Sequence, residues 1–134
     1  MIADFIAFLE SDATLAALLR AGGSNTKIFG QLAPYGEETP FILYAVSTDG
    51  TADDLIDEVT ISLRHCGETY HEALALVDRV TEIADKQDDV VIPSSSNKAF
   101  YCKKIGGSDT FEPDTMRHVL TRLYHLKHKR LNGG

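Results

Sequence analysis

The chain has 134 residues and a formal net charge of -7, with 43% hydrophobic and 25% charged residues. This length fits about one domain, and the composition excludes disordered, collagen-like and low-complexity chains. No apolar stretch approaches the roughly 20 residues of a membrane-spanning helix, and the N-terminal segment has no basic residue before Arg20, unlike a secretory signal. The two cysteines, Cys66 and Cys102, lack CxxC spacing, which indicates reduced thiols in an intracellular protein.

Charge is unevenly distributed along the chain. Residues 1–97 hold five Lys or Arg against seventeen Asp or Glu, a net of -12, whereas residues 98–134 hold eight against three, a net of +5. An acidic protein is a poor candidate for wrapping nucleic acid, so the acidic part favours a protein partner. The basic end lacks the interleaved aromatic residues of a base-stacking surface. We expect residues 1–134 to form one domain whose end, residues 127–134, is flexible and solvated.

The first segment is predicted to be helical. Apolar residues recur at helical spacing over residues 2–9 and 15–19, with Ser11 and Asp12 between the two groups. Either polar side chain can cap a new turn, so the segment forms one kinked helix or two short helices in series. Two glycines at 22 and 23 favour its end.

The next segments have strand character. Residues 24–40 are rich in Gly and Pro and form an irregular connection with one short strand at 28–29. Residues 41–47 are apolar on both faces, as in a strand covered on both sides, and residues 56–65 alternate with a period of two. These two strands should form an antiparallel hairpin around a long acidic loop. The apolar side chains of the second strand should face the core: Val59, Ile61 and Leu63.

A long amphipathic helix follows the hairpin. Thr69 and Glu72 form a capping-box pattern, in which the threonine side chain accepts from the third backbone N–H and the glutamate reaches back. Apolar residues then form one stripe as far as Asp85: Ala73, Leu76, Val77, Val80, Ile83 and Ala84.

The C-terminal third is predicted to complete a sheet. Residues 90–92 and 98–105 are expected strands joined by a loop at 93–97, and the Gly-Gly-Ser-Asp sequence at 106–109 is expected to turn the chain. Residues 116–127 fit both a helix and a strand, and we favour a strand. The fold class is therefore α+β: a mostly antiparallel sheet with a hairpin, flanked by an N-terminal helix pair and one long amphipathic helix.

Several residues have metal-binding or nucleophilic side chains, but none stands in a diagnostic pattern. The potential soft metal ligands fall in two sets without ligand spacing: His65, Cys66 and His71, then His118, His125 and His128. His65 and Cys66 point to opposite faces of a continuous strand. A Cys–His nucleophile pair is the enzymatic alternative, but no orienting Asn or Asp can be singled out. We expect no enzyme activity, no metal and no cofactor.

Two further motifs are explained by turns and solvation. The glycine pairs at 22–23 and 106–107 lack the spacing of a phosphate-binding loop. The aspartates at 49, 53, 54 and 57 match a calcium loop in composition only, because the DxDxDG order and the terminal Glu are absent. These aspartates are expected at a solvated hairpin tip.

The order of elements resembles the tail-completion and tail-terminator proteins of long-tailed bacteriophages. The matching segments are residues 8–19, 28–34, 39–44, 58–63 and 70–80. Each motif alone is weak, and their order and spacing carry the resemblance, which spans nearly the whole chain. The 93–97 loop and the basic extension after Leu126 have no counterpart in that family.

The resemblance implies a structural virion protein with no catalytic step. Such proteins form a six-membered ring on the head-proximal end of the tail tube, where they stop its polymerisation and offer a surface to the head connector. The implied partners are the tail tube protein, the head connector or stopper protein and other copies of the chain. From the composition we expect the free chain to be a monomer, because no large apolar run remains for an interface once the core positions are assigned. Viral DNA would pass through the lumen without specific binding, and no membrane is involved. The protein would lie at the head–tail interface of the virion, after assembly in the host cytoplasm.

Three rival functions are weighed against this one. The first is another head–tail connector piece, a head-completion or stopper protein, and the second is a small Cys/His-dependent enzyme. The third is a nucleic-acid-binding module that uses the basic C-terminal end. A ring needs two different faces on each subunit, and acidic and basic regions could supply complementary ones. We therefore expect the subunit or partner interface to include the following residues: Asp49, Asp53, Asp54, Asp57, Arg117, Arg122, Lys127, Lys129 and Arg130.

Overall fold

A computed structural model describes residues 2–19, 27–33, 36–47, 58–85, 87–92 and 95–130. Within these ranges the elements follow in the order α1 (Ile2–Glu10), α2 (Ala13–Leu18), β1 (Ile28–Gly30), β2 (Phe41–Ser47), β3 (Glu58–Gly67), α3 (Tyr70–Ala84), β4 (Gln87–Ile92), β5 (Ser95–Glu112) and β6 (Arg117–Arg130).

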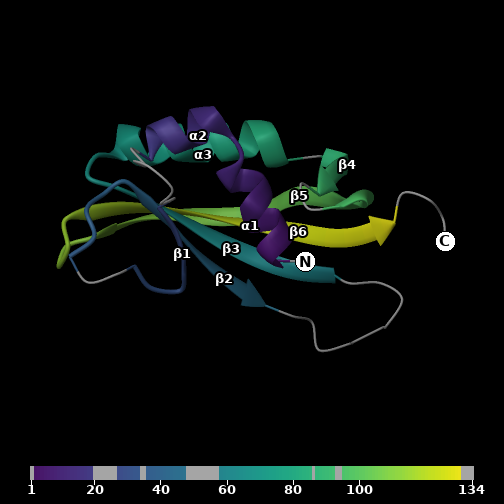
Figure 1. Cartoon of the computed structure of the whole chain (residues 1–134). Coiled ribbons are helices and arrows are strands. Elements are labelled where there is room, and N and C mark those ends of the chain that lie inside the picture. The colour runs from purple at the N-terminus through teal and green to yellow at the C-terminus, as the bar shows by residue number, and fades with distance from the viewer. Residues whose placement is uncertain are drawn as a thin grey trace.

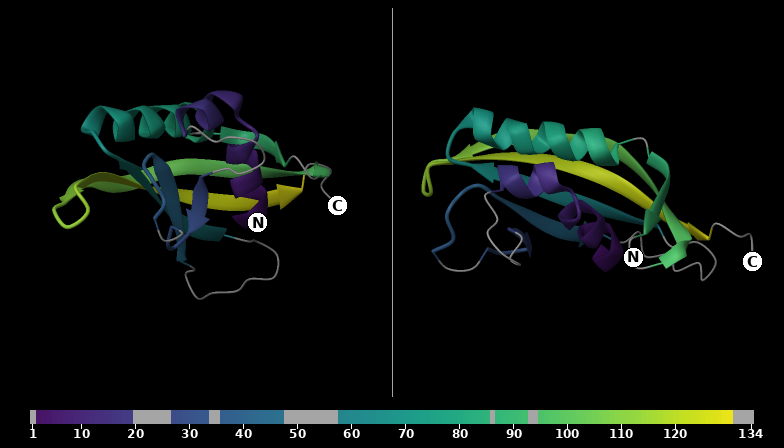
Figure 2. Two further views of the ribbon diagram at one scale, coloured as in Figure 1. Left: turned by 60° about the vertical axis from the view of Figure 1, so that its left-hand side comes forward. Right: turned by 45° about the horizontal axis from the view of Figure 1, so that its top comes forward.

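The strands form one sheet in the order β1-β2-β3-β6-β5-β4. Its pairs are antiparallel except for β1 with β2, which is parallel. The three helices gather on one side of this sheet, where α2 and α3 lie along one face (Figures 1 and 2). The turn between β5 and β6 lies at one end of the sheet, and the C-terminal end of β6 lies at the other (Figure 1). The expected α+β class, with a mostly antiparallel sheet, is confirmed.

The N-terminal segment forms two helices in series, and Asp12 is the residue that separates them. Its carboxylate accepts a hydrogen bond from the backbone N–H of Leu15 at 2.8 Å, which caps α2. The same carboxylate accepts two hydrogen bonds from the Arg79 guanidinium of α3, at 2.8 and 2.7 Å. This bidentate contact holds the pKa of Asp12 below its usual range. Asp12 therefore starts α2 and also ties it to α3.

Helix α3 begins at the predicted capping box. Thr69 Oγ1 accepts from the Glu72 backbone N–H at 3.1 Å, as expected. The Glu72 carboxylate accepts from the backbone N–H of Glu68 at 2.9 Å, one residue before the cap. The chain reaches this cap through Gly67, where an added Cβ would lie 2.6 Å from the backbone nitrogen of Ala73. The first turn of α3 therefore packs directly on the end of β3.

The main core lies between the helices and the sheet. It includes Ile61 and Leu63 of β3, both with 0% exposure, which confirms the predicted inward face. The predicted stripe of α3 is also confirmed, since all its members are buried except Ile83, which is half-buried. The other large contributors come from all parts of the chain: Phe5, Leu9, Leu15, Ile42, Tyr124 and Leu126.

A smaller core covers part of the opposite face of the sheet. Phe41 and Leu43 of β2 pack there with Cys66 and Val119, and Phe29 and Ala33 lie against them. Because Ile42 points into the main core while its neighbours point into this one, β2 is covered on both faces over its first half. Its last residues, Val46 and Ser47, are exposed.

The predicted turn at 106–109 is wrong, because β5 continues through it to Glu112. The ladder between β5 and β6 shifts register between Lys104 and Gly106, which is a β-bulge. At Gly107 an added Cβ would collide with the Thr121 carbonyl oxygen of β6. The glycines therefore allow close backbone approach within a strand, and the chain turns at residues 113–116 instead.

Two other expected boundaries change. Residues 116–127 are a strand, as favoured, but β6 extends to Arg130 because Lys98 of β5 pairs with that residue. Residues 127–130 are therefore part of the sheet rather than of a flexible end. The expected loop at 93–97 is shorter, because β5 begins at Ser95, which pairs with Ile92.

Candidate functional site

The potential nucleophiles lie inside the protein. Cys66 and Cys102 are each 2% exposed. Burial raises the pKa of Cys66 to about 11 and that of Cys102 to about 12. Since the thiolate is the nucleophile, these thiols are chemically quiet near neutral pH. His65 and Cys66 lie in separate environments, as their alternation along the strand predicted, and Cys66 belongs to the smaller core.

His65 is the one buried polar residue of the described chain. Its Nδ1 lies 2.8 Å from the carbonyl oxygen of Leu120. Because a carbonyl only accepts, Nδ1 carries a proton and donates it. Nε2 has no hydrogen-bond partner within the described residues. Burial is the main cause that lowers the pKa of His65 to about 4; the hydrogen bond to Leu120 acts in the opposite direction, and the nearby charge of Arg122 also lowers the pKa.

Metal and membrane sites have no support among the described residues. No group of three or more His, Cys, Asp or Glu side chains in that part of the chain is placed to hold a metal ion. In the same ranges no helix is long and apolar enough to cross a membrane.

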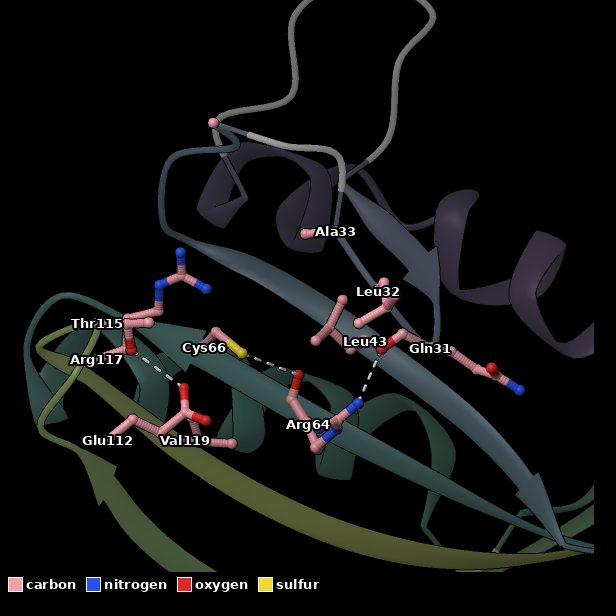
Figure 3. A pocket seen from close by; sticks show the side chains of 11 residues that line it. Gln31, Leu32, Ala33, Leu43, Arg64, Cys66, Glu112, Thr115, Arg117 and Val119 are labelled. Carbon is pink, nitrogen blue, oxygen red and sulfur yellow. Dashed lines mark hydrogen bonds between the residues drawn. The ribbon is translucent and has the colours of Figure 1, made fainter.

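A hollow of the described surface lies on the face of the sheet opposite the helices (Figure 3). Its volume is about 400 Å³. The apolar part of its lining comes from the smaller core, through Leu43, Cys66 and Val119, and from Leu32 and Ala33 of the segment after β1. Leu32 is 80% exposed, so it stands at the rim of this hollow with its side chain open to solvent. We call this hollow the sheet-face pocket.

Two arginines and one glutamate supply the charge at the rim of this pocket. Arg64 of β3 donates a hydrogen bond from Nη2 to the Gln31 carbonyl oxygen at 2.9 Å. Arg117 of β6 lies over the ring of Phe41, with its Cζ 5.0 Å from the ring centroid. Glu112 accepts a hydrogen bond from Thr115 at 3.2 Å. In Figure 3 the two arginines lie on either side of Cys66, so the pocket has an apolar floor between two guanidinium groups.

A second exposed surface, on the helix side of the β5–β6 hairpin, is aromatic. Phe111 and His118 are cross-strand partners whose rings lie 4.8 Å apart, and Tyr70 lies 6.1 Å from His118. Tyr70 is 42% exposed and Phe111 is 45% exposed. Aromatic residues are enriched in protein interfaces. This surface was missed from the sequence because the hairpin turn was expected at 106–109, which separates these residues.

The predicted interface residues are not gathered on one surface. Arg117 faces the sheet-face pocket, whereas Arg122 lies on the helix side and pairs with Asp109 at 2.6 Å. Lys127 is half-buried in β6, and Lys129 and Arg130 are in the same strand, with side chains outside the described ones. The four predicted acidic residues also lie outside the described residues: Asp49, Asp53, Asp54 and Asp57.

Comparison with known proteins gives a fold and no family. No family model matches the sequence, and no curated protein matches it. Among solved structures, the chain is similar to one from the virion of a native gene transfer agent (GTA) particle, with a TM-score of 0.64. The match covers 92% of this chain and 90% of the other, at 13% sequence identity. The two chains share a fold over nearly their whole lengths.

Proposed function

We propose that this chain is a structural protein of a virion-like particle. The observation that carries the proposal is the likeness to a chain of the GTA virion, which extends over 92% of this chain and 90% of the other. The likeness agrees with the resemblance of the sequence segments to phage tail-completion and tail-terminator proteins. The sequence segments and the fold both favour a particle protein.

Within this class, we propose a subunit of the tail-completion or tail-terminator ring. Six copies would cap the head-proximal end of the tail tube, contact the tube protein on one side and the head connector or stopper on the other, and let DNA pass without specific binding. A cyclic ring needs two different surfaces on each subunit. The sheet-face pocket and the aromatic surface at Tyr70 and Phe111 are on opposite sides of the sheet, which suits this requirement.

The proposal assigns no catalytic step to the chain. It is supported by the burial of both thiols and by the high pKa that burial gives them. The protein would be made in the host cytoplasm and end at the head–tail interface of the particle.

Negative-stain microscopy of the gold-labelled full chain mixed with purified tails tests the ring proposal. We expect label at the head-proximal tip of the tail, and tubes of uncontrolled length when the gene is deleted. Label on the head connector, with tails of normal length in the deletion, would replace the terminator role by the head-completion or stopper role. Label on neither structure would overturn the proposal.

A further inference from the structure

The sheet-face pocket combines an apolar floor with positive charge on both sides. Leu43, Cys66 and Val119 are buried residues that form the floor. Arg64 and Arg117 flank it. A ligand that fits this lining has a short apolar group with carboxylates close on either side, because each guanidinium favours an anionic partner.

The two pocket arginines differ from Arg79 and Arg122, whose side chains are also described. Arg79 is paired with Asp12 and Glu82, and Arg122 is paired with Asp109. Within the described part of the chain, no ion pair joins Arg64 or Arg117 to a carboxylate. Their recorded contacts are a backbone carbonyl and an aromatic ring. The one carboxylate of the pocket lining, Glu112, is the cross-strand partner of Arg117 and accepts a hydrogen bond from Thr115, so two positive charges and one negative charge line the pocket.

The sequence itself contains a segment with the matching chemistry. Residues 53–57 read Asp-Asp-Leu-Ile-Asp, an apolar pair with carboxylates on both sides. This segment belongs to the connection between β2 and β3, whose acidic residues were expected at an interface from the sequence alone. Its order of negative, apolar and negative groups is complementary to Arg64, the apolar floor and Arg117, and these two arginines outnumber Glu112, the one carboxylate of the lining.

We propose that the sheet-face pocket of one copy of the chain binds residues 53–57 of a second copy. Leu55 and Ile56 would cover the apolar floor, and the flanking aspartates would pair with Arg64 and Arg117. The inference deepens the proposed function, on which it rests for the closure of repeated contacts into a ring.

The reach of the chain requires the segment to come from another copy. Glu58 begins β3, and Arg64 lies six residues further along the same strand, about 20 Å away at the usual rise. Leu55 is three residues before Glu58, so extended backbone carries it at most about 10 Å from that residue. Within one copy of the chain, Leu55 can therefore cover only about half of the distance from Glu58 to the pocket.

The contact is heterologous because it joins the two ends of the sheet. The pocket lies near Cys66, at the end of the β2–β3 pair where Cys66 is paired with Phe41. The segment that contains residues 53–57 connects Ser47 of β2 to Glu58 of β3, which are at the other end of the same two strands. A contact between two different surfaces repeats around a ring when the rotation closes. Each copy can then bind one neighbour through its pocket and a second neighbour through its residues 53–57.

Fluorescence anisotropy of a labelled peptide of residues 48–58, titrated with the full chain at low salt, tests the contact. We expect saturable binding that weakens at least tenfold in Arg64→Glu and in Arg117→Glu. The matched control is Lys103→Glu, which makes the same charge change at an exposed residue of β5 outside the pocket lining and should bind like wild type. A peptide with Leu55→Ser and Ile56→Ser keeps every carboxylate and should also bind at least tenfold more weakly.

Three results would overturn the inference: no saturable binding, an equal loss in Lys103→Glu, or no effect of the two serine substitutions in the peptide. Circular dichroism of each variant establishes that it is folded, and if Arg117→Glu does not fold, Arg64→Glu and the serine peptide decide the outcome. The titration contains no tails. If the peptide does not bind but tail tips carry the label, this contact is rejected and the ring function stands. If the peptide binds but tails carry no label, the contact stands and the ring function is rejected.

Discussion

His65 is an ionisable side chain held neutral inside the protein, and this makes stability depend on pH. Burial lowers its pKa from 6.5 to about 4, so the unfolded chain takes up the proton first as the pH falls. Stability should therefore be constant above about pH 6.5 and decrease between about pH 6.5 and 4. This difference between the pKa values of the unfolded and folded chain corresponds to a decrease in the free energy of unfolding on the order of 3 kcal/mol.

Denaturant unfolding at a series of pH values measures this decrease. His65→Leu removes the titrating group and should flatten the pH dependence in that window, whatever its effect on stability at neutral pH. His71→Leu, at an exposed position of α3, is the matched control and should keep the wild-type profile. An unchanged profile in His65→Leu would show that other groups cause the acid sensitivity.

The two thiols are expected to be structural. Because Cys66 and Cys102 are buried and their pKa values are raised, the folded protein should react slowly with a thiol reagent near pH 8 and rapidly in denaturant. Cys102→Ser, at a residue outside the sheet-face pocket, should leave particle assembly intact. A folded serine variant that fails to assemble particles would show that a thiol has a functional role.

At the scale of the element, the two faces of β3 should differ in energy. Ile61 is fully buried between the sheet and the helices, so Ile61→Ala should lower the free energy of unfolding by about 2 to 5 kcal/mol. Thr60 is half-buried on the opposite face, and Thr60→Ala should have a much smaller effect. Urea unfolding of both variants makes the comparison, and equal losses would contradict the assignment of the faces.

The glycine pair in β5 gives a second matched comparison. In Gly107→Ala the new methyl group meets the Thr121 carbonyl oxygen of the neighbouring strand, and overpacking of this kind costs roughly 1 to 3 kcal/mol. In Gly106→Ala the nearest atom would be Leu123 Cδ1 at 3.9 Å, which is ordinary contact. Thermal unfolding should show a lower melting temperature in the first variant and little change in the second. Equal melting temperatures would mean that the two strands separate easily at this point.

The elements were predictable where one local pattern decides them. The α3 stripe and the alternation in β3 each follow from burial of one face, and Asp12 and Thr69 cap helices through contacts within three residues. The course of β5 was not predictable in this way. Gly106 and Gly107 are typical of a turn, and only pairing with β6, more than ten residues away, keeps them in a strand.

The sheet-face pocket depends on the whole molecule, which is why the sequence did not reveal it. Its rim residues Gln31, Arg64 and Arg117 are separated by tens of residues and meet only because β6 lies next to β3 in the sheet. Charge counting along the chain did select Arg117 together with the acidic connection. It also selected Arg122, which the fold places on the other face in an ion pair with Asp109.

The free protein should be monomeric or weakly associated at micromolar concentration, with ring formation completed on the tail tip. Stable oligomers usually have large and more apolar interfaces. Here Tyr70 and Phe111 share the aromatic surface around His118, and the other exposed large apolar residues of the described chain lie on separate segments: Leu32, Val46, Ile105 and Met116. Assembly on a template is then favoured, because a tube that holds several subunits raises their local concentration and lets weak contacts act together.

Salt should weaken this association, since the expected contacts pair the acidic connection of one copy with basic groups of another. Sedimentation velocity of the free protein at low and high salt measures both properties. We expect a small associated fraction at low salt that disappears at high salt, and a further loss at low salt in Arg64→Glu. A stable hexamer that forms without tails and is unchanged by salt would contradict both the assembly route and its electrostatic origin.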